Sequence, residues 1–301
     1  MKIGITSPIY VKNEEHKRYL DLTTRSIVST EHDIVWIPVE NYIDSSLVPL
    51  SYTFDHEPDQ ISIVKPQGQQ SVSKAWNLGI LEAKRLDCDY VLVINHDIVF
   101  KTNAIDRLVA FANSCVEDRP GFDENAVMWT MAEYADLALL EESPEDENFS
   151  EHPHFSCFMV KPDFFKHVGM FDENFIPAYL EDGCCHARLA LSNLKAYIYG
   201  GARFYHFGSR IIKSDQEEWE KNKITFPRNQ QYFLEKFGHP PVNEVTQMRE
   251  IYFKHPYNIQ ELAINEYIPD FWNFLKANNV DHIKDVPKEK VLAYLQERGL
   301  R

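Results

Sequence analysis

Short apolar runs rich in β-branched side chains alternate with helical segments over the first hundred residues. Of all the sequence features, this alternation restricts the possible folds most strongly. Residues 33–39 and 90–94 read DIVWIPV and YVLVI, which is typical of buried strands. Between them, residues 71–85 place apolar side chains on one face of a helix. This order predicts an α/β fold with a mostly parallel central sheet flanked by helices. The expected strands are 2–6, 33–39, 61–64 and 90–94, and the expected helices are 14–28 and 71–85.

Polar residues directly follow the run at 90–94. In parallel sheets, ligands bind at the carboxyl ends of the strands. Asn95 and Asp97 stand two positions apart at this end, so in an extended chain their side chains point the same way. Such a pair of oxygen ligands suits Mg²⁺ or Mn²⁺. The same residues also fit a strand that simply ends in an Asx turn.

The charge balance restricts the partners. Lys and Arg number 31 against 46 Asp and Glu, which gives a net charge of −15. A surface this acidic repels phosphate backbones and anionic lipid, so we expect no nucleic-acid partner. A nucleotide diphosphate could bind with the help of a bridging cation or a local basic pocket.

Cysteine usage and the amino terminus predict a cytoplasmic protein. The cysteine count is odd and no C-x-x-C spacing occurs, which argues against a disulfide framework. The Cys184-Cys185-His186 run matches no ordinary zinc spacing. The start MKIGITSPIY is not a signal peptide, and no apolar run is long enough to span a membrane. The cysteines are Cys88, Cys115, Cys157, Cys184 and Cys185.

Two further positions carry candidate chemistry. Glu181 and Asp182 open an apparent helix that runs to about residue 193. An acid there can be a helix cap, or it can accept a proton from an attacking hydroxyl. His206 ends an apolar stretch, where a histidine is either structural or a neutral ligand in a metal shell.

Five motifs follow one another in a fixed order. They comprise Gly68, Asn77, Gly79 and Ile80; Ile94 to Asp97; Phe171, Asp172, Glu173, Phe175, Glu181, Asp182 and Arg188; His206, Gly208 and Ser209; and Asn229, Tyr232, Phe233, Lys236, Phe237 and Gly238. In this order and spacing the chain resembles a family 2 glycosyltransferase of the GT-A fold, and most of all its rhamnosyltransferase-like branch. The resemblance covers residues 1–240. It implies a Rossmann-like GT-A domain there, and the pattern predicts a helical extension of unknown role over 241–301.

The resemblance also implies an activity. A sugar would move from a nucleotide-diphosphate sugar to a hydroxyl of a glycan or glycoconjugate, with inversion and with the help of Mn²⁺ or Mg²⁺. Asp97 and His206 would bind the metal ion, and Asp182 would be the general base, with Glu181 as the alternative base. Arg188 would orient or pair with that carboxylate.

The remaining implied contacts belong to the donor. Asn95 would contact the ribose or a metal-bound water. Glu40 and Asn41 stand where the family has an acid that touches the base or ribose, and Gly68 and Asn77 lie in the segment before the metal motif.

Other functions are also considered. Cys184 replaces an acid of the family motif, which allows a nucleotide-sugar-binding module that has lost catalysis. A nucleotidyltransferase would carry a Gly-rich basic loop near the amino terminus, and GITSPIYVKNEE lacks one. A dehydrogenase would carry G-x-G-x-x-G after the first strand, which is absent here.

Overall fold

The computed structural model describes residues 1–116, 125–191, 194–208 and 215–237, and the single positions 287, 290 and 293. Apart from those three positions, the expected extension over 241–301 lies outside the described residues, as does the expected boundary near 240. In the part of the chain that is described, no helix combines the length and the apolarity needed to cross a membrane.

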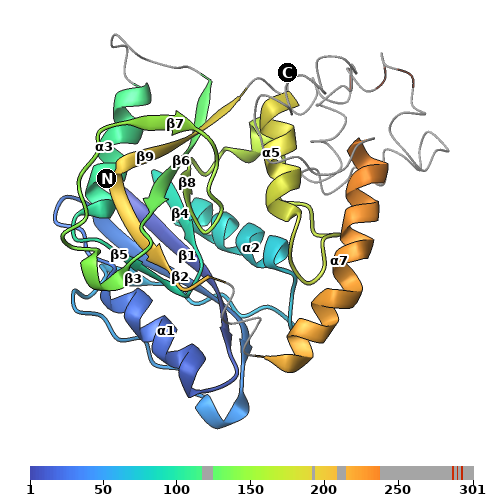
Figure 1. Ribbon diagram of the computed structural model, residues 1–301, viewed down its shortest axis with the longest axis horizontal. Helices are drawn as coiled ribbons and strands as arrows, with labels where there is room; N and C mark the ends of the chain where they lie inside the picture. The colour runs from blue at the N-terminus through green and yellow to red at the C-terminus, as the bar shows by residue number, and fades with distance from the viewer. Residues whose placement is uncertain are drawn as a thin grey trace.

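A single mixed sheet forms the centre of the molecule (Figure 1). Its strands are β1 (Lys2–Val11), β2 (Asp33–Ile43), β3 (Gln60–Ile61), β4 (Tyr90–Ile94), β5 (Ile98–Phe100), β6 (Ala126–Glu133), β7 (Phe149–Glu151), β8 (Cys157–Val160) and β9 (Lys195–His206). Their order is β3-β2-β1-β4-β8-β6-β9-β5, and β7 pairs with β9.

Helices cover both faces of this sheet. They are α1 (Glu14–Arg25), α2 (Val72–Arg85), α3 (Ala104–Val116), α4 (Phe165–Val168), α5 (Glu181–Leu191) and α7 (Gln216–Phe237), with 3₁₀ turns η1 (Ser45–Leu47) and η2 (Leu137–Leu139). Buried side chains of α1 and α3 share one hydrophobic core with the sheet. Side chains of α2, α4 and α5 form the core on the opposite face. A third, smaller cluster joins α5 to α7, so α7 packs outside α5 (Figure 1).

The strand β4 shows why its sequence is apolar throughout. Leu92 and Ile94 belong to one core, whereas Val91 and Val93 belong to the other. A strand that is covered on both faces needs apolar side chains at every position. The expected boundaries 90–94 match the strand that the structure shows.

The α/β fold with a large sheet flanked by helices is confirmed. The strands on which the expectation rested, β3, β2, β1 and β4, are parallel to one another. Antiparallel ladders join β8 to β4 and to β6, and β5 and β7 to β9, so the sheet is mixed.

The helix α2 lies unusually close to β1. A Cβ atom built on Gly79 would lie 1.9 Å from Thr6 Oγ1. Thr6 is itself fixed, because its hydroxyl donates to the carbonyl of Ile37 over 2.8 Å. A side chain at position 79 would have to displace Thr6 or the helix, so glycine allows α2 to pack this closely on β1.

Candidate active site

A cavity of about 570 Å³ opens where the strands β1, β4 and β9 end. Its wall includes the end of β1, the residues after β4, the end of β9 and the starts of α5 and α7. Asp97 and Asp182, the two carboxylates on which the sequence interpretation depends, both line it. Of the residues to which the resemblance assigned a role, the lining contains Asn41, Asn95, Asp97, Glu181, Asp182 and His206.

Strand pairing brings His206 to Asp97. The antiparallel ladder of β5 and β9 places His206 opposite Ile98, the residue after Asp97. The Nε2 atom of His206 lies 3.2 Å from Asp97 Oδ1 and 3.4 Å from Asn95 Nδ2. Burial alone would lower the pKa of His206, but the hydrogen bond and the negative charge of Asp97 raise it.

This group of side chains fits a divalent cation that is shared with a substrate. No set of three or more His, Cys, Asp or Glu side chains suited to a metal ion occurs among the described residues. Mg²⁺ and its relatives are commonly held by one or two protein ligands together with substrate phosphates. Asp97 and His206 supply such a pair, and substrate oxygens would complete the shell.

Glu181 and Asp182 form the opposite wall, at the first turn of α5. The two residues before them, Tyr179 and Leu180, have φ angles of 76° and 75°. Successive non-glycine residues in this left-handed region are strained by about 1–2 kcal/mol each. The amide of Asn229 on α7 holds this turn by donating to the carbonyls of Ala178 and Tyr179 over 3.0 and 3.2 Å. Helix packing therefore fixes the position of the acidic pair.

The two carboxyls differ in their electrostatics. Burial raises the pKa of Glu181 well above its usual range, and the neighbouring Asp182 raises it further. Burial also raises the pKa of Asp182, but backbone N–H groups oppose the rise, among them Gly183 N–H at 2.7 Å. Glu181 is thus the more strongly protonated member, and Asp182 is the one more readily available as a base.

Four residues expected to bind the donor or to orient the base do not line the cavity. Glu40 is held by the hydroxyl of Tyr52 at 3.1 Å and by Lys65 Nζ at 3.0 Å. Gly68 lies in a turn with a φ angle of 71°. The remaining two, Asn77 and Arg188, are buried and bind backbone.

Asn77 and Arg188 fix the segment that leads to α5. The side chain of Asn77 donates to the carbonyl of Phe171 and accepts from its N–H, both at 2.9 Å. Arg188 donates to the carbonyls of Val168 and Met170 at 3.0 and 2.7 Å. Arg188 is fully buried. Their place in the sequence motif therefore reflects packing of the chain.

The cysteine pair is also structural. Cys184 and Cys185 are buried, and they belong to two different cores. The next residue, His186, lines the cavity, where its ring lies 5.6 Å from that of His152. A zinc site at Cys184-Cys185-His186 gains no support.

Asn41 has a structural role at the rim of the cavity. Its side chain accepts from the N–H of Gln70 at 2.6 Å and donates to the carbonyl of Gln70 at 3.0 Å. This pair of bonds fixes the loop before α2, and Gln69 and Gln70 line the cavity there.

Sequence reasoning missed a stripe on α7. Glu218, Asn222 and Phe226 line the cavity, and their spacing of four residues puts them on one helix face. That spacing was visible in the sequence, but nothing in it indicated that this face turns towards the site. His152 and His154 are further lining residues that the motifs did not include.

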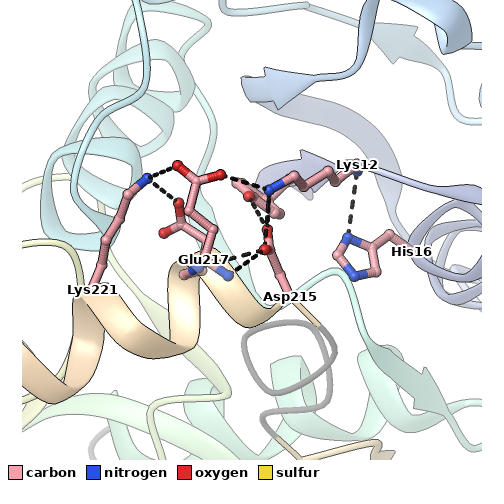
Figure 2. A network of polar contacts seen from close by, with 7 residues as sticks. Lys12, His16, Asp215, Glu217 and Lys221 are labelled. Carbon is pink, nitrogen blue, oxygen red and sulfur yellow. Dashed lines mark hydrogen bonds and ion pairs between the residues drawn. The ribbon is translucent and has the colours of Figure 1, made fainter.

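Contacts with β1 fix the beginning of α7 (Figure 2). Lys12 Nζ lies 2.8 Å from Asp215 Oδ2 and 3.2 Å from Glu217 Oε2. The hydroxyl of Tyr10, which lines the cavity, donates to Asp215 over 2.7 Å. The ring of Tyr10 stacks on Tyr42 at 5.1 Å between centroids.

The described lining of the cavity is strongly acidic. It contains four acidic side chains, of which Glu181 is the most readily protonated, and neither Lys nor Arg. A diphosphate would be repelled by this surface unless a cation accompanied it. The acidic side chains are Asp97, Glu181, Asp182 and Glu218.

Comparison with known proteins identifies the fold. No family model matches the chain, and no curated protein sequence matches it. Solved structures do. The mannosyltransferase PcManGT from Pyrobaculum calidifontis, in complex with GDP-Man and Mn²⁺, matches with a TM-score of 0.50 and 10% identity over 99% of this chain and 79% of that one.

A second solved structure is GalNAc-T7 with UDP, GalNAc and Mn²⁺. It matches with a TM-score of 0.50 and 10% identity over 92% of this chain. This chain spans 57% of that one. At such low identity the likeness establishes the fold alone, and that fold is the GT-A fold.

Proposed function

We propose that this protein is a metal-dependent, inverting glycosyltransferase that moves a hexosyl or deoxyhexosyl group from a nucleotide-diphosphate sugar to a hydroxyl of a glycan or glycoconjugate. The observation that carries the proposal is the shared cavity of Asp97, His206 and Asp182. The two similar structures, one with UDP, GalNAc and Mn²⁺ and the other with GDP-Man and Mn²⁺, support it. We further propose the rhamnosyltransferase-like branch, because the sequence motifs resemble it most.

The residues divide the work between the two walls. Asp97 and His206 would hold a divalent cation, which would neutralise the charge that develops on the departing diphosphate. Asp182 accepts the proton of the acceptor hydroxyl while the oxygen of that hydroxyl attacks the anomeric carbon of the donor sugar. The bond from that carbon to the diphosphate oxygen breaks in the same step, and the nucleoside diphosphate leaves. A single displacement of this kind inverts the anomeric centre.

The rival function, a binding module without catalysis, rested on Cys184. That side chain is buried in the cluster between α5 and α7 and does not line the cavity. The replacement of an acid at this position therefore leaves the candidate base in place, and we do not favour the rival.

The test is a thermal-shift screen of nucleoside diphosphates and nucleotide-sugars with and without Mn²⁺. A ligand that binds only the folded state stabilises it by mass action, by about 3 kcal/mol at a concentration of 100 Kd, and so raises the melting temperature. We expect at least one compound to do so with Mn²⁺ and to lose the effect in EDTA. Asp97→Ala should abolish the shift, since it removes the charged ligand.

Asp55→Ala is the matched control. Asp55 is an exposed carboxylate paired with Arg25, so this variant should respond like the wild type. An equal shift in EDTA, or an unchanged shift in Asp97→Ala, would refute the role of the metal ion.

A further inference from the structure

The helix α7 carries two buried asparagines that differ in their hydrogen bonding. Asn229 donates to the carbonyls of Ala178 and Tyr179, as described above, and accepts from Ile176 N–H at 3.4 Å. Asn222 is only 4% exposed. Within the described part of the chain, neither its Nδ2 nor its Oδ1 atom has a hydrogen-bond partner.

Folding does not explain Asn222. Buried polar groups are almost always paired, and an unpaired one destabilises the folded state. Asn229 satisfies this rule by fixing the turn before α5. Asn222 instead faces the cavity that it lines, so a bound molecule is the partner that its amide can reach.

The position of Asn222 relates it to the acidic pair. One helical turn before it lies Glu218, near the end of α7 that Lys12 and Asp215 attach to β1 (Figure 2). One turn after it lies Phe226, whose ring is 5.9 Å from that of Tyr179. Tyr179 belongs to the strained turn that precedes Glu181 and Asp182. Asn222 therefore stands between the end of β1 and the wall that holds the candidate base.

The chemistry of an amide limits what can satisfy it. The side chain of asparagine offers two donors on nitrogen and an acceptor on oxygen. A phosphate offers acceptors only and would leave Oδ1 unpaired, whereas a cation would pair with Oδ1 and leave Nδ2 unpaired. A pair of neighbouring hydroxyls supplies a donor and an acceptor together. Lys221 Nζ lies 2.7 Å from Glu218 Oε1, which leaves the other oxygen of this carboxylate to accept from a further hydroxyl. Phe226 offers an apolar face for sugar C–H groups.

We propose that Asn222, with Glu218 and Phe226, forms the subsite that recognises the acceptor sugar, and that this sugar is uncharged and carries neighbouring hydroxyls. Asp97 and Asp182 in the described lining oppose an anionic acceptor, and no Lys or Arg of that lining compensates for them. This inference rests on the proposed function, because it assigns the acceptor side of the same cavity.

The experiment uses saturation-transfer NMR with methyl α-mannopyranoside, methyl α-rhamnopyranoside and methyl β-glucopyranoside as probes. Asn222→Leu removes the amide and keeps the number and branching of the side-chain heavy atoms. We expect wild type to bind at least one neutral glycoside, and Asn222→Leu to weaken that binding by about tenfold or more. Binding of UDP or GDP with Mn²⁺ should be unchanged in the variant.

Asn229→Leu is the matched control on the same helix. It breaks hydrogen bonds to the turn before α5, so its melting temperature should fall. Asn222→Leu loses no hydrogen bond within the protein, so its melting temperature should equal or exceed that of wild type. This readout separates recognition of a ligand from a structural role.

Three outcomes overturn the subsite. They are unchanged glycoside binding in Asn222→Leu, a loss of nucleotide binding in place of glycoside binding, and a fall in melting temperature like that of Asn229→Leu. If wild type binds nucleotide with Mn²⁺ but no glycoside, the subsite fails while the proposed function stands. If wild type binds no nucleotide, the proposed function fails, and the glycoside comparison still decides the subsite.

Discussion

At the scale of single residues, Glu181 and Asp182 show how two adjacent carboxyls take different protonation states. Both are removed from water, which raises the pKa of each. Glu181 also experiences the charge of Asp182 and titrates at the higher pH. A protonated carboxyl cannot accept a proton, so the electrostatics favour Asp182 as the base.

We therefore expect Asp182→Asn to lower the rate of sugar transfer by about 10²–10⁴-fold, which is the usual effect of removing a general base. Nucleotide binding with Mn²⁺ should remain, because Asp97 and His206 are unchanged. The rate is measured as transfer to an acceptor, or as release of nucleoside diphosphate from the donor, and binding is measured by calorimetry.

The control is Glu181→Gln, which resembles a protonated glutamic acid and should keep most of the activity. The pH profile supplies a second check. Asp182 must be deprotonated to act, so activity should fall as the pH falls through its raised pKa, above the usual value of about 3.9 for aspartate. A loss of activity in Glu181→Gln alone would reverse the assignment.

At the scale of elements, the contact of α2 with β1 determines how closely the helix approaches the sheet. The room beside Thr6 admits no side chain at Gly79, since an added Cβ would also lie 2.8 Å from Thr6 Cβ. A β-branched residue such as threonine has little freedom to move away. Alanine is more favourable than glycine in a helix by about 1 kcal/mol, and we expect the free-energy cost of the clash to exceed this gain.

We expect Gly79→Ala to destabilise the fold by about 1–3 kcal/mol, as overpacking of a core does. Urea unfolding followed by circular dichroism measures the change. Gly183→Ala is the comparison, because a Cβ there would meet Phe233 Cε2 at an ordinary 3.6 Å. A variant Gly79→Ala as stable as wild type would show that the helix can move away without cost.

At the scale of the whole molecule, one buried ion pair attaches α7 to the segment before α5. Asp172 Oδ2 lies 2.7 Å from Lys236 Nζ and 2.7 Å from the hydroxyl of Tyr232. Burial alone would raise the pKa of Asp172, but Lys236 and these hydrogen bonds lower it to about 2. A carboxyl whose pKa is lower in the folded state stabilises the protein above its unfolded pKa, and this contribution is lost as the pH falls through the folded pKa.

The expected result is a loss of about 2 kcal/mol of stability from this carboxyl as the pH falls from about 5 to 2. The measurement compares the free energy of unfolding of wild type and Asp172→Asn across this range. The variant should be less stable at pH 7, and the difference should shrink in acid. Asp55→Asn, at an exposed pair with Arg25, should show little of this effect. A difference that stays constant with pH would contradict the assignment.

The local sequence pattern was sufficient to predict several strands and helices and part of the candidate site. The strand at 90–94 and the helix over 71–85, with Ser71 as its cap, follow from side-chain period and capping, which act within a few residues. The carboxyl end of β4 followed from the topology of parallel strands. For that reason Asn95 and Asp97 could be placed at a ligand site before the cavity was known.

Other features of the site required the tertiary structure. His206 reaches Asp97 only because β9 pairs with β5, and Asn222 faces the cavity only because α7 packs outside α5. Asn77 on α2 and Arg188 on α5 both bind the segment from Val168 to Phe171, although both stand in motifs that indicated a ligand. The sequence thus determined which segments are strands and helices, since that depends on short-range periodicity. Which polar side chains meet in the cavity depends on contacts between segments far apart in the chain, and only the folded packing decided it.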